Sequence, residues 1–177
     1  MAKVRRERVG ELEVVITGGS DGVGGENGPL LVLLHGFGAP GTDLVGLSSM
    51  LSAPAGTRFA FPAAPLSLSS VPELGFGMMD ARAWWLIDIE RLQALQAGRV
   101  ARVASEEVPA GLAAARDKLN QTLDALERGL GVPAGQTVLG GFSQGAMLAT
   151  DVMLRSGRKL AGVVLWLAGV LVLGTLL

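Results

Sequence analysis

The sequence predicts an open, mostly parallel β-sheet with helices on both of its faces. Short, unbroken apolar runs alternate along the chain with segments whose apolar residues recur every three or four positions. The clearest run is LLVLL at Leu30–Leu34, which has the composition of a strand buried on both faces. The clearest helical segment covers residues 111–130. Such an alternation of strands and helices is typical of an α/β domain.

The first half of the chain supplies three expected strands and one helix. The ELEVVI run at residues 11–16 predicts a first strand, and a glycine-rich loop at 17–29 connects it to the LLVLL strand. Residues 43–51 predict a helix, and residues 58–61 predict a further strand. That strand ends at prolines, which cannot donate hydrogen bonds to a sheet.

The second half begins with an irregular stretch at residues 66–109, which carries a helical pattern near residues 87–96. The amphipathic helix over 111–130 follows, and a glycine and a proline directly after it predict its end. An apolar run at 137–142 predicts the next strand, and residues 144–156 predict the helix that leaves it.

Composition narrows the range of functions. With 177 residues the chain predicts one domain, and with 15 basic against 16 acidic residues it has no basic stripe that would bind nucleic acid. Its sequence contains no cysteine and one histidine, so we expect neither disulfides nor a zinc site, and no cofactor. The first ten residues are charged and lack the apolar run of a secretory signal, which predicts a cytoplasmic protein.

Residues 160–177 form an apolar run without a single charge, long enough for a membrane span. The alternative is that the run begins as a buried parallel strand at residues 161–165, because such strands are nearly continuous in valine and leucine. We favour the strand. An unpaired strand at this end would offer a sheet edge to a second copy of the chain, so a homo-oligomer through this edge is a further hypothesis.

The pentapeptide GFSQG at residues 141–145 predicts a nucleophile turn. An apolar strand runs into it and a helix runs out of it, so the Ser143 hydroxyl would project above the sheet. Gly141 and Gly145 are expected there because a side chain at either position would clash with the neighbouring strand or helix. The start of the helix would also place N–H groups beside a developing oxyanion. The alternative is an ordinary strand-to-helix turn with a capping serine.

A second glycine-rich loop, HGFGAPG at residues 35–41, follows the central strand. It fits the other half of an oxyanion hole, in which the N–H groups of Phe37 and Gln144 would both donate. A phosphate-binding loop is disfavoured, since neither a GxGxxG pattern nor a Walker lysine is present.

Four segments together resemble a known family, namely LLHGFGAPGTDL at 33–44, FPAAPLSL at 61–68, ARAWWLIDI at 81–89 and LGGFSQGAMLATDVML at 139–154. The chain is similar over residues 10–165 to the phospholipase/carboxylesterase family of α/β-hydrolases, which includes the acyl-protein thioesterases. The resemblance implies that Ser143 is the nucleophile, that Phe37 and Gln144 supply oxyanion N–H groups, and that His35 and Gly36 support the oxyanion loop. It also implies a small carboxylic ester or thioester as substrate.

The chain departs from this family after the nucleophile. The family places its acid and its histidine on loops after the last strands, whereas only 34 residues follow Ser143 here and none is histidine. We therefore expect an α/β-hydrolase domain that lacks the last strands and is incomplete at its C-terminus. Asp151 lies on the helix that leaves the turn and would point away from the hydroxyl. The one histidine, His35, is the remaining candidate base, although its family-like role is to brace the loop.

Two adjacent tryptophans, Trp84 and Trp85, are candidates for a substrate pocket at the C-terminal edge of the sheet, and core packing is the alternative. The sequence thus predicts a serine esterase with an incomplete triad. Two alternatives remain, which are a hydrolase-derived binding or interaction module without turnover, and a membrane-anchored variant held by residues 160–177.

Overall fold

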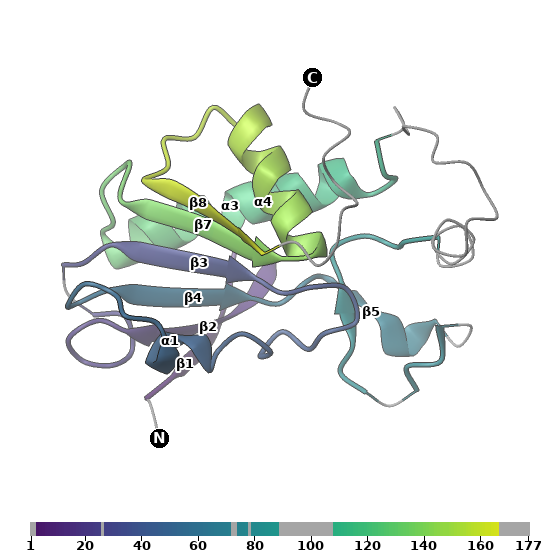
Figure 1. Cartoon of the computed structure of the whole chain (residues 1–177), viewed down its shortest axis with the longest axis horizontal. Coiled ribbons are helices and arrows are strands. Elements are labelled where there is room, and N and C mark those ends of the chain that lie inside the picture. The colour runs from purple at the N-terminus through teal and green to yellow at the C-terminus, as the bar shows by residue number, and fades with distance from the viewer. Residues whose placement is uncertain (1–2, 26, 72–73, 78, 89–107, 167–177) are drawn as a thin grey trace.

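A six-stranded sheet organises the protein. The computed structural model describes residues 3–25, 27–71, 74–77, 79–88 and 108–166. The sheet has the order β1-β2-β4-β3-β7-β8 (Figure 1). Its strands are β1 Arg5–Val9, β2 Leu12–Gly18, β3 Leu30–Leu34, β4 Arg58–Pro62, β7 Thr137–Phe142 and β8 Gly162–Trp166. The pairs β1–β2 and β2–β4 are antiparallel, and the remaining three neighbouring pairs are parallel. The prediction of an open, mostly parallel sheet is confirmed.

Helices cover one face of the sheet over most of its width. Helix α3 spans Leu112–Leu130 and α4 spans Gln144–Arg155, and the two lie together on the same side (Figure 1). The apolar stripe of α3 is buried, with Leu119 and Leu123 both fully enclosed. Each such leucine contributes about 1.5–3 kcal/mol relative to an exposed one. This main core also takes one set of alternating strand residues, including Val32 and Leu34 of β3.

The opposite face carries a smaller core. Leu33 of β3 and Phe61 of β4 belong to it, together with apolar side chains from residues 44–53. Helix α1 within that segment spans only Leu47–Met50, so the prediction of a helix over 43–51 is corrected. Successive i→i+3 hydrogen bonds, such as Val45 to Thr42, form turns around it in place of a continuous α-helix.

Three short strands and one 3-10 helix of the described residues were not predicted from the sequence. Strand β1, with the sequence RRERV, is charged at its first four positions and lies at the sheet edge, where those side chains alternate between half-buried and exposed and Val9 is buried. Strands β5 (Leu66–Ser67) and β6 (Arg82–Ala83) form a separate antiparallel pair within the stretch predicted to be irregular, with the 3-10 helix η1 (Leu68–Ser70) after β5. The helix predicted near residues 87–96 falls almost entirely outside the described residues.

The start of the C-terminal apolar run is a strand. Strand β8 pairs in parallel with β7 and matches the expectation for residues 161–165 to within one residue. Among the described residues, no helix is both long and apolar enough to cross a membrane. Val164, Leu165 and Trp166 are 36–39% exposed, so this edge of the sheet is apolar and partly open. Residues 167–177 lie outside the described part of the chain.

Candidate active site

Ser143 lies on a strained turn between β7 and α4. Its φ of 51° and ψ of −113° make it the only described residue other than glycine with a positive φ. For a residue with a side chain this conformation costs on the order of 1–3 kcal/mol and persists only where the surroundings impose it. The Ser143 N–H donates to the Trp166 carbonyl over 2.8 Å, and the Ser143 carbonyl accepts from Ala146 and Met147. The turn is thus held from β8 on one side and from the helix on the other.

The two glycines of the pentapeptide stand at points of close main-chain approach. A Cβ on Gly141 would lie 2.3 Å from the Gly145 carbonyl carbon. A Cβ on Gly145 would lie 2.2 Å from the Leu34 oxygen and 2.7 Å from the His35 oxygen. Neither position accommodates a side chain, and the start of α4 consequently lies directly against the end of β3.

The loop after β3 runs beside the serine. A Cβ on Gly36 would lie 3.2 Å from the Phe142 ring and 3.5 Å from the Ser143 Cβ. In the described part of the chain no hydrogen-bond acceptor is assigned to the main-chain N–H of Phe37 or of Gln144. The Phe37 ring makes an edge contact with Phe76 at 6.2 Å between centroids. Two N–H groups from separate segments are therefore available in the neighbourhood of Ser143.

His35 is buried, with 1% of its surface exposed, and both of its ring nitrogens are engaged. The Ala64 N–H donates to Nε2 over 3.0 Å, so Nδ1 carries the ring proton and donates it to the Gly36 carbonyl at 2.8 Å. Burial lowers the pKa of His35 below its usual 6.5, although the Gly36 hydrogen bond opposes this. A neutral imidazole with two satisfied nitrogens has no free lone pair with which to accept the serine proton.

The two tryptophans pack in the main core, the arrangement that the sequence left open as the alternative to a pocket lining. Trp84 is 2% exposed and Trp85 is 3% exposed. The buried Gln144 side chain binds their main chain, because its Oε1 accepts from Trp84 N–H at 2.9 Å and its Nε2 donates to the Trp85 carbonyl at 2.8 Å. The Trp84 Nε1–H donates to the His35 carbonyl at 3.0 Å.

Sequence reasoning missed the residues that hold the loop from the β5–β6 side. The Arg82 carbonyl accepts from the Gly38 N–H at 2.9 Å, and the Arg82 guanidinium donates to the Ala64 carbonyl at 3.1 Å. Ala64 in turn provides the N–H that His35 accepts. Each of these contacts has at least one main-chain partner, and the residue types of Gly38 and Ala64 carried no signal for them. One indication of their importance was present in the sequence, which is that Ala64 and Arg82 lie in FPAAPLSL and ARAWWLIDI, two of the four segments that resemble the family.

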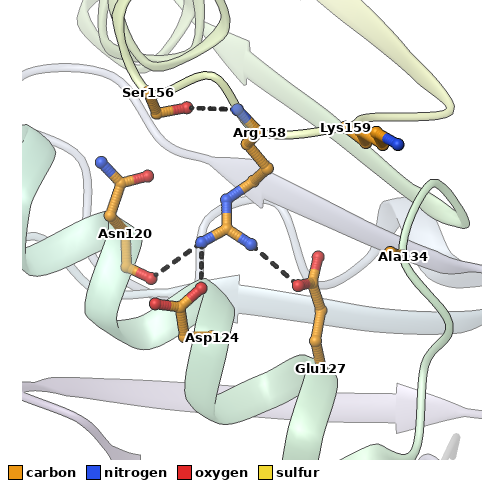
Figure 2. Close-up of a pocket in the computed structure, with 7 residues that line it drawn as sticks. All are labelled: Asn120, Asp124, Glu127, Ala134, Ser156, Arg158 and Lys159. Carbon is orange, nitrogen blue, oxygen red and sulfur yellow. Dashed lines mark hydrogen bonds and ion pairs between the residues drawn. The ribbon is translucent and has the colours of Figure 1, made fainter.

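A surface pocket of about 470 Å³ lies at the other end of α4 (Figure 2). Its residues gather around the Arg158 guanidinium, which pairs with Glu127 at 2.8 Å and with Asp124. Helix α4 has 12 residues and is about 18 Å long, so this pocket is remote from Ser143. Asp151 is likewise engaged elsewhere, in ion pairs at 2.9 Å with Arg116 of α3 and with Arg155. Neither group belongs to the site around Ser143.

The strand order and the serine turn define the class of protein. Two antiparallel pairs followed by parallel strands, with a strained serine between β7 and the helix that follows it, are the architecture of an α/β-hydrolase. The sequence model of the family described as phospholipase/carboxylesterase matches residues 23–176. The chain belongs to that family, as its sequence motifs indicated.

Solved structures agree with this assignment. Esterase PE8 is 28% identical with a TM-score of 0.63, and the match covers 91% of this chain and 62% of that one. A carboxylesterase from Mesorhizobium loti is 16% identical with a TM-score of 0.64, covering 92% and 63% of the two chains. The Bacillus cereus carboxylesterase is 20% identical with a TM-score of 0.55, covering 87% and 58%. The last two show likeness of fold alone. No curated protein matches the sequence.

This chain spans less than two thirds of the length of these related structures, 62% for esterase PE8 and 63% for the Mesorhizobium loti enzyme.

We predict that Gly145→Ala destabilises the protein by at least about 2 kcal/mol, because the new Cβ would press on the Leu34 carbonyl. Gly129→Ala is the matched control. Gly129 lies within α3 with nothing within 4 Å of its would-be Cβ, so alanine there should stabilise by about 0.5–1 kcal/mol. Urea unfolding of both variants checks this, and equal effects of the two substitutions would contradict the close contact of α4 with β3.

A second prediction concerns the loss of folding stability at low pH through His35. Because burial lowers the pKa of His35, the unfolded chain binds its proton more tightly than the folded chain. The stability contributed by neutral His35 should be fully present above about pH 6.5 and should fall as the pH drops below that value. Urea midpoints of the wild type and of His35→Gln between pH 7.5 and 5 measure this. Because the chain has one histidine, His35→Gln should lose the fall in urea midpoint that the wild type shows below about pH 6.5. Equal pH dependence of the two midpoints would contradict the lowered pKa of His35.

Proposed function

We propose that the protein acts on carboxylic esters or thioesters as a serine esterase, with Ser143 as its nucleophile. One observation carries the proposal, which is the strained φ of 51° that Ser143 adopts between β7 and α4. A serine held in this way presents its hydroxyl above the sheet, and the surrounding fold must compensate for the strain. Membership of the phospholipase/carboxylesterase family supports the same reaction class.

The main-chain N–H groups of Phe37 and Gln144 would stabilise the oxyanion. Both belong to segments that border Ser143, and no acceptor is assigned to either one in the described part of the chain. Donors fixed before the reaction begins are effective because they need no reorganisation as charge develops on the carbonyl oxygen. The N-terminal end of α4 adds a partial positive charge beside the same point.

The reaction would proceed in two steps. Ser143 Oγ forms a bond to the substrate carbonyl carbon while its proton passes to solvent water, and the carbonyl oxygen becomes the oxyanion. The bond to the leaving alcohol or thiol then breaks, and that group takes up a proton. Water hydrolyses the acyl-enzyme by the same sequence. His35 does not fit the role of base, because both of its nitrogens are engaged and it serves the loop instead.

A second candidate function, binding of an ester without turnover, is favoured by that same engagement of His35. Such a module would use the oxyanion N–H pair and the serine turn to hold a carbonyl group. The two functions differ in a single measurable property, which is whether any hydrolysis depends on Ser143.

For the 177-residue chain we predict slow hydrolysis of p-nitrophenyl butyrate that is abolished in Ser143→Ala. A serine protease without triad members retains only about 10³ to 10⁴ over the uncatalysed rate, so kcat should stay below the ordinary enzyme range of about 1 to 10³ s⁻¹. His35→Ala should mainly lower stability, by about 1–3 kcal/mol, because the buried Ala64 N–H loses its acceptor.

Two outcomes of that assay would change the assignment. Hydrolysis that survives Ser143→Ala undiminished would exclude Ser143 as the nucleophile. Hydrolysis in the ordinary enzyme range that is lost in both Ser143→Ala and a folded His35→Ala would instead make His35 the base. Binding of the ester with no Ser143-dependent hydrolysis would favour the binding module.

We also propose that a second copy of the chain is a partner, through the β8 edge. Val164, Leu165 and Trp166 are partly exposed there, and an apolar strand edge tends to pair with another chain. We predict a dimer or larger species by light scattering at about tens of micromolar, and a shift toward monomer in Leu165→Lys. A wild-type monomer at these concentrations would remove the proposal.

A further inference from the structure

Three segments that are far apart in the sequence meet in a buried hydrogen-bonded cluster behind the serine turn. They are the end of β3 with its loop, the stretch that follows β6, and the first residue of α4. His35, Trp84 and Gln144 come one from each segment and are between 1% and 2% exposed. None of these three side chains takes part directly in the proposed reaction steps. Their buried hydrogen bonds therefore point to another role.

The Gln144 side chain fixes the start of α4 to the middle segment. Its amide bonds the Trp84 N–H through Oε1 and the Trp85 carbonyl through Nε2, at 2.9 and 2.8 Å. Both groups of the side-chain amide are satisfied by neighbouring main-chain atoms. The backbone of Gln144, which carries one of the proposed oxyanion N–H groups, is therefore held in position by its own side chain.

The Trp84 side chain fixes the middle segment to the loop. Its Nε1–H donates to the His35 carbonyl at 3.0 Å, and its ring packs on the imidazole at 5.6 Å between centroids. That carbonyl belongs to the peptide unit that leads into Gly36 and then Phe37, the source of the other proposed N–H. His35 holds the same loop a second time, through its bond to the Gly36 carbonyl.

We propose that Trp84 is a positioning residue for the oxyanion hole, which joins the loop bearing the Phe37 N–H and the helix start bearing the Gln144 N–H into one rigid unit. This inference rests on the proposed function. Trp84 touches no reacting atom and acts only through the placement of two main-chain donors.

The physical basis is the steep dependence of oxyanion stabilisation on donor geometry. The N–H groups must lie about 2.7–3.1 Å from the oxyanion, and a misplacement of about 1 Å can cost on the order of 100-fold in rate. Glycines at 36 and 38 leave the loop few side chains of its own with which to fix its path. The indole N–H is a donor from outside the loop that restrains it without blocking access to the serine.

Trp84→Phe tests the proposal because it removes the N–H and keeps an aromatic ring in the core. Trp85→Phe is the matched control, since it shrinks an equally buried neighbour and leaves its main-chain carbonyl in place for Gln144. With p-nitrophenyl butyrate, Trp84→Phe should lower Ser143-dependent kcat by about 10- to 100-fold with little change in KM. Trp85→Phe should lower kcat less than about threefold. Equal losses in the two variants would overturn the proposal.

A second readout separates this inference from the proposed function. Amide hydrogen exchange at Ala64 and Gly38 reports on the loop directly, because these N–H groups bond to His35 Nε2 and to the Arg82 carbonyl. We expect Trp84→Phe to speed exchange at both amides by at least about tenfold relative to Trp85→Phe, at matched unfolding midpoints. Unchanged exchange would refute the positioning role. A wild type without Ser143-dependent hydrolysis would refute the esterase while leaving this test of the loop intact.

Discussion

The site depends on the close contact between the start of α4 and the end of β3. Gly145 approaches the Leu34 and His35 carbonyls so closely that a Cβ has no room, at 2.2 and 2.7 Å. That contact puts the serine turn beside the loop that follows β3. The parallel pairing of β3 with β7 sets up this approach, since both strands then end at the same edge of the sheet.

The strain at Ser143 is supported by bonds on every side of the turn. Its N–H is tied to β8 through Trp166, its carbonyl to the first turn of α4, and the neighbouring Gln144 to the tryptophan segment. A half-buried serine in a disfavoured backbone conformation and a nearly inaccessible histidine are thus parts of one arrangement. The histidine serves the geometry of the loop, which explains why it is neutral, buried and fully hydrogen-bonded.

Most of the sheet could be predicted from the sequence because its central strands are short apolar runs between glycines and prolines. The strand at the start of the C-terminal run followed from the same kind of pattern. The strand β1 could not be predicted, because its mostly charged sequence has no alternation of apolar and polar residues. It forms a strand by pairing with β2. The helix expected over 43–51 is mostly turns, because Leu44, Val45 and Leu47 pack on the smaller core from successive turns, which does not require a continuous helical stripe.

At the site, the pentapeptide and the loop were visible as motifs, whereas the packing of Trp84 and Trp85 was not. A pair of tryptophans near the end of a sheet fits a pocket and a core equally well, and only the three-dimensional contacts decide between the two. The His35 imidazole and the Arg82 guanidinium both bond to main-chain atoms of Ala64, and an alanine at that position gives no indication of these contacts.

The most direct measurement is the site of covalent modification by a fluorophosphonate, located by peptide mass mapping of the intact 177-residue chain. The account predicts one adduct per chain, confined to the peptide that carries Ser143 and absent in Ser143→Ala. Modification formed at another residue, or no adduct after prolonged exposure of the folded protein to excess reagent, would contradict the assignment of Ser143 as the nucleophile.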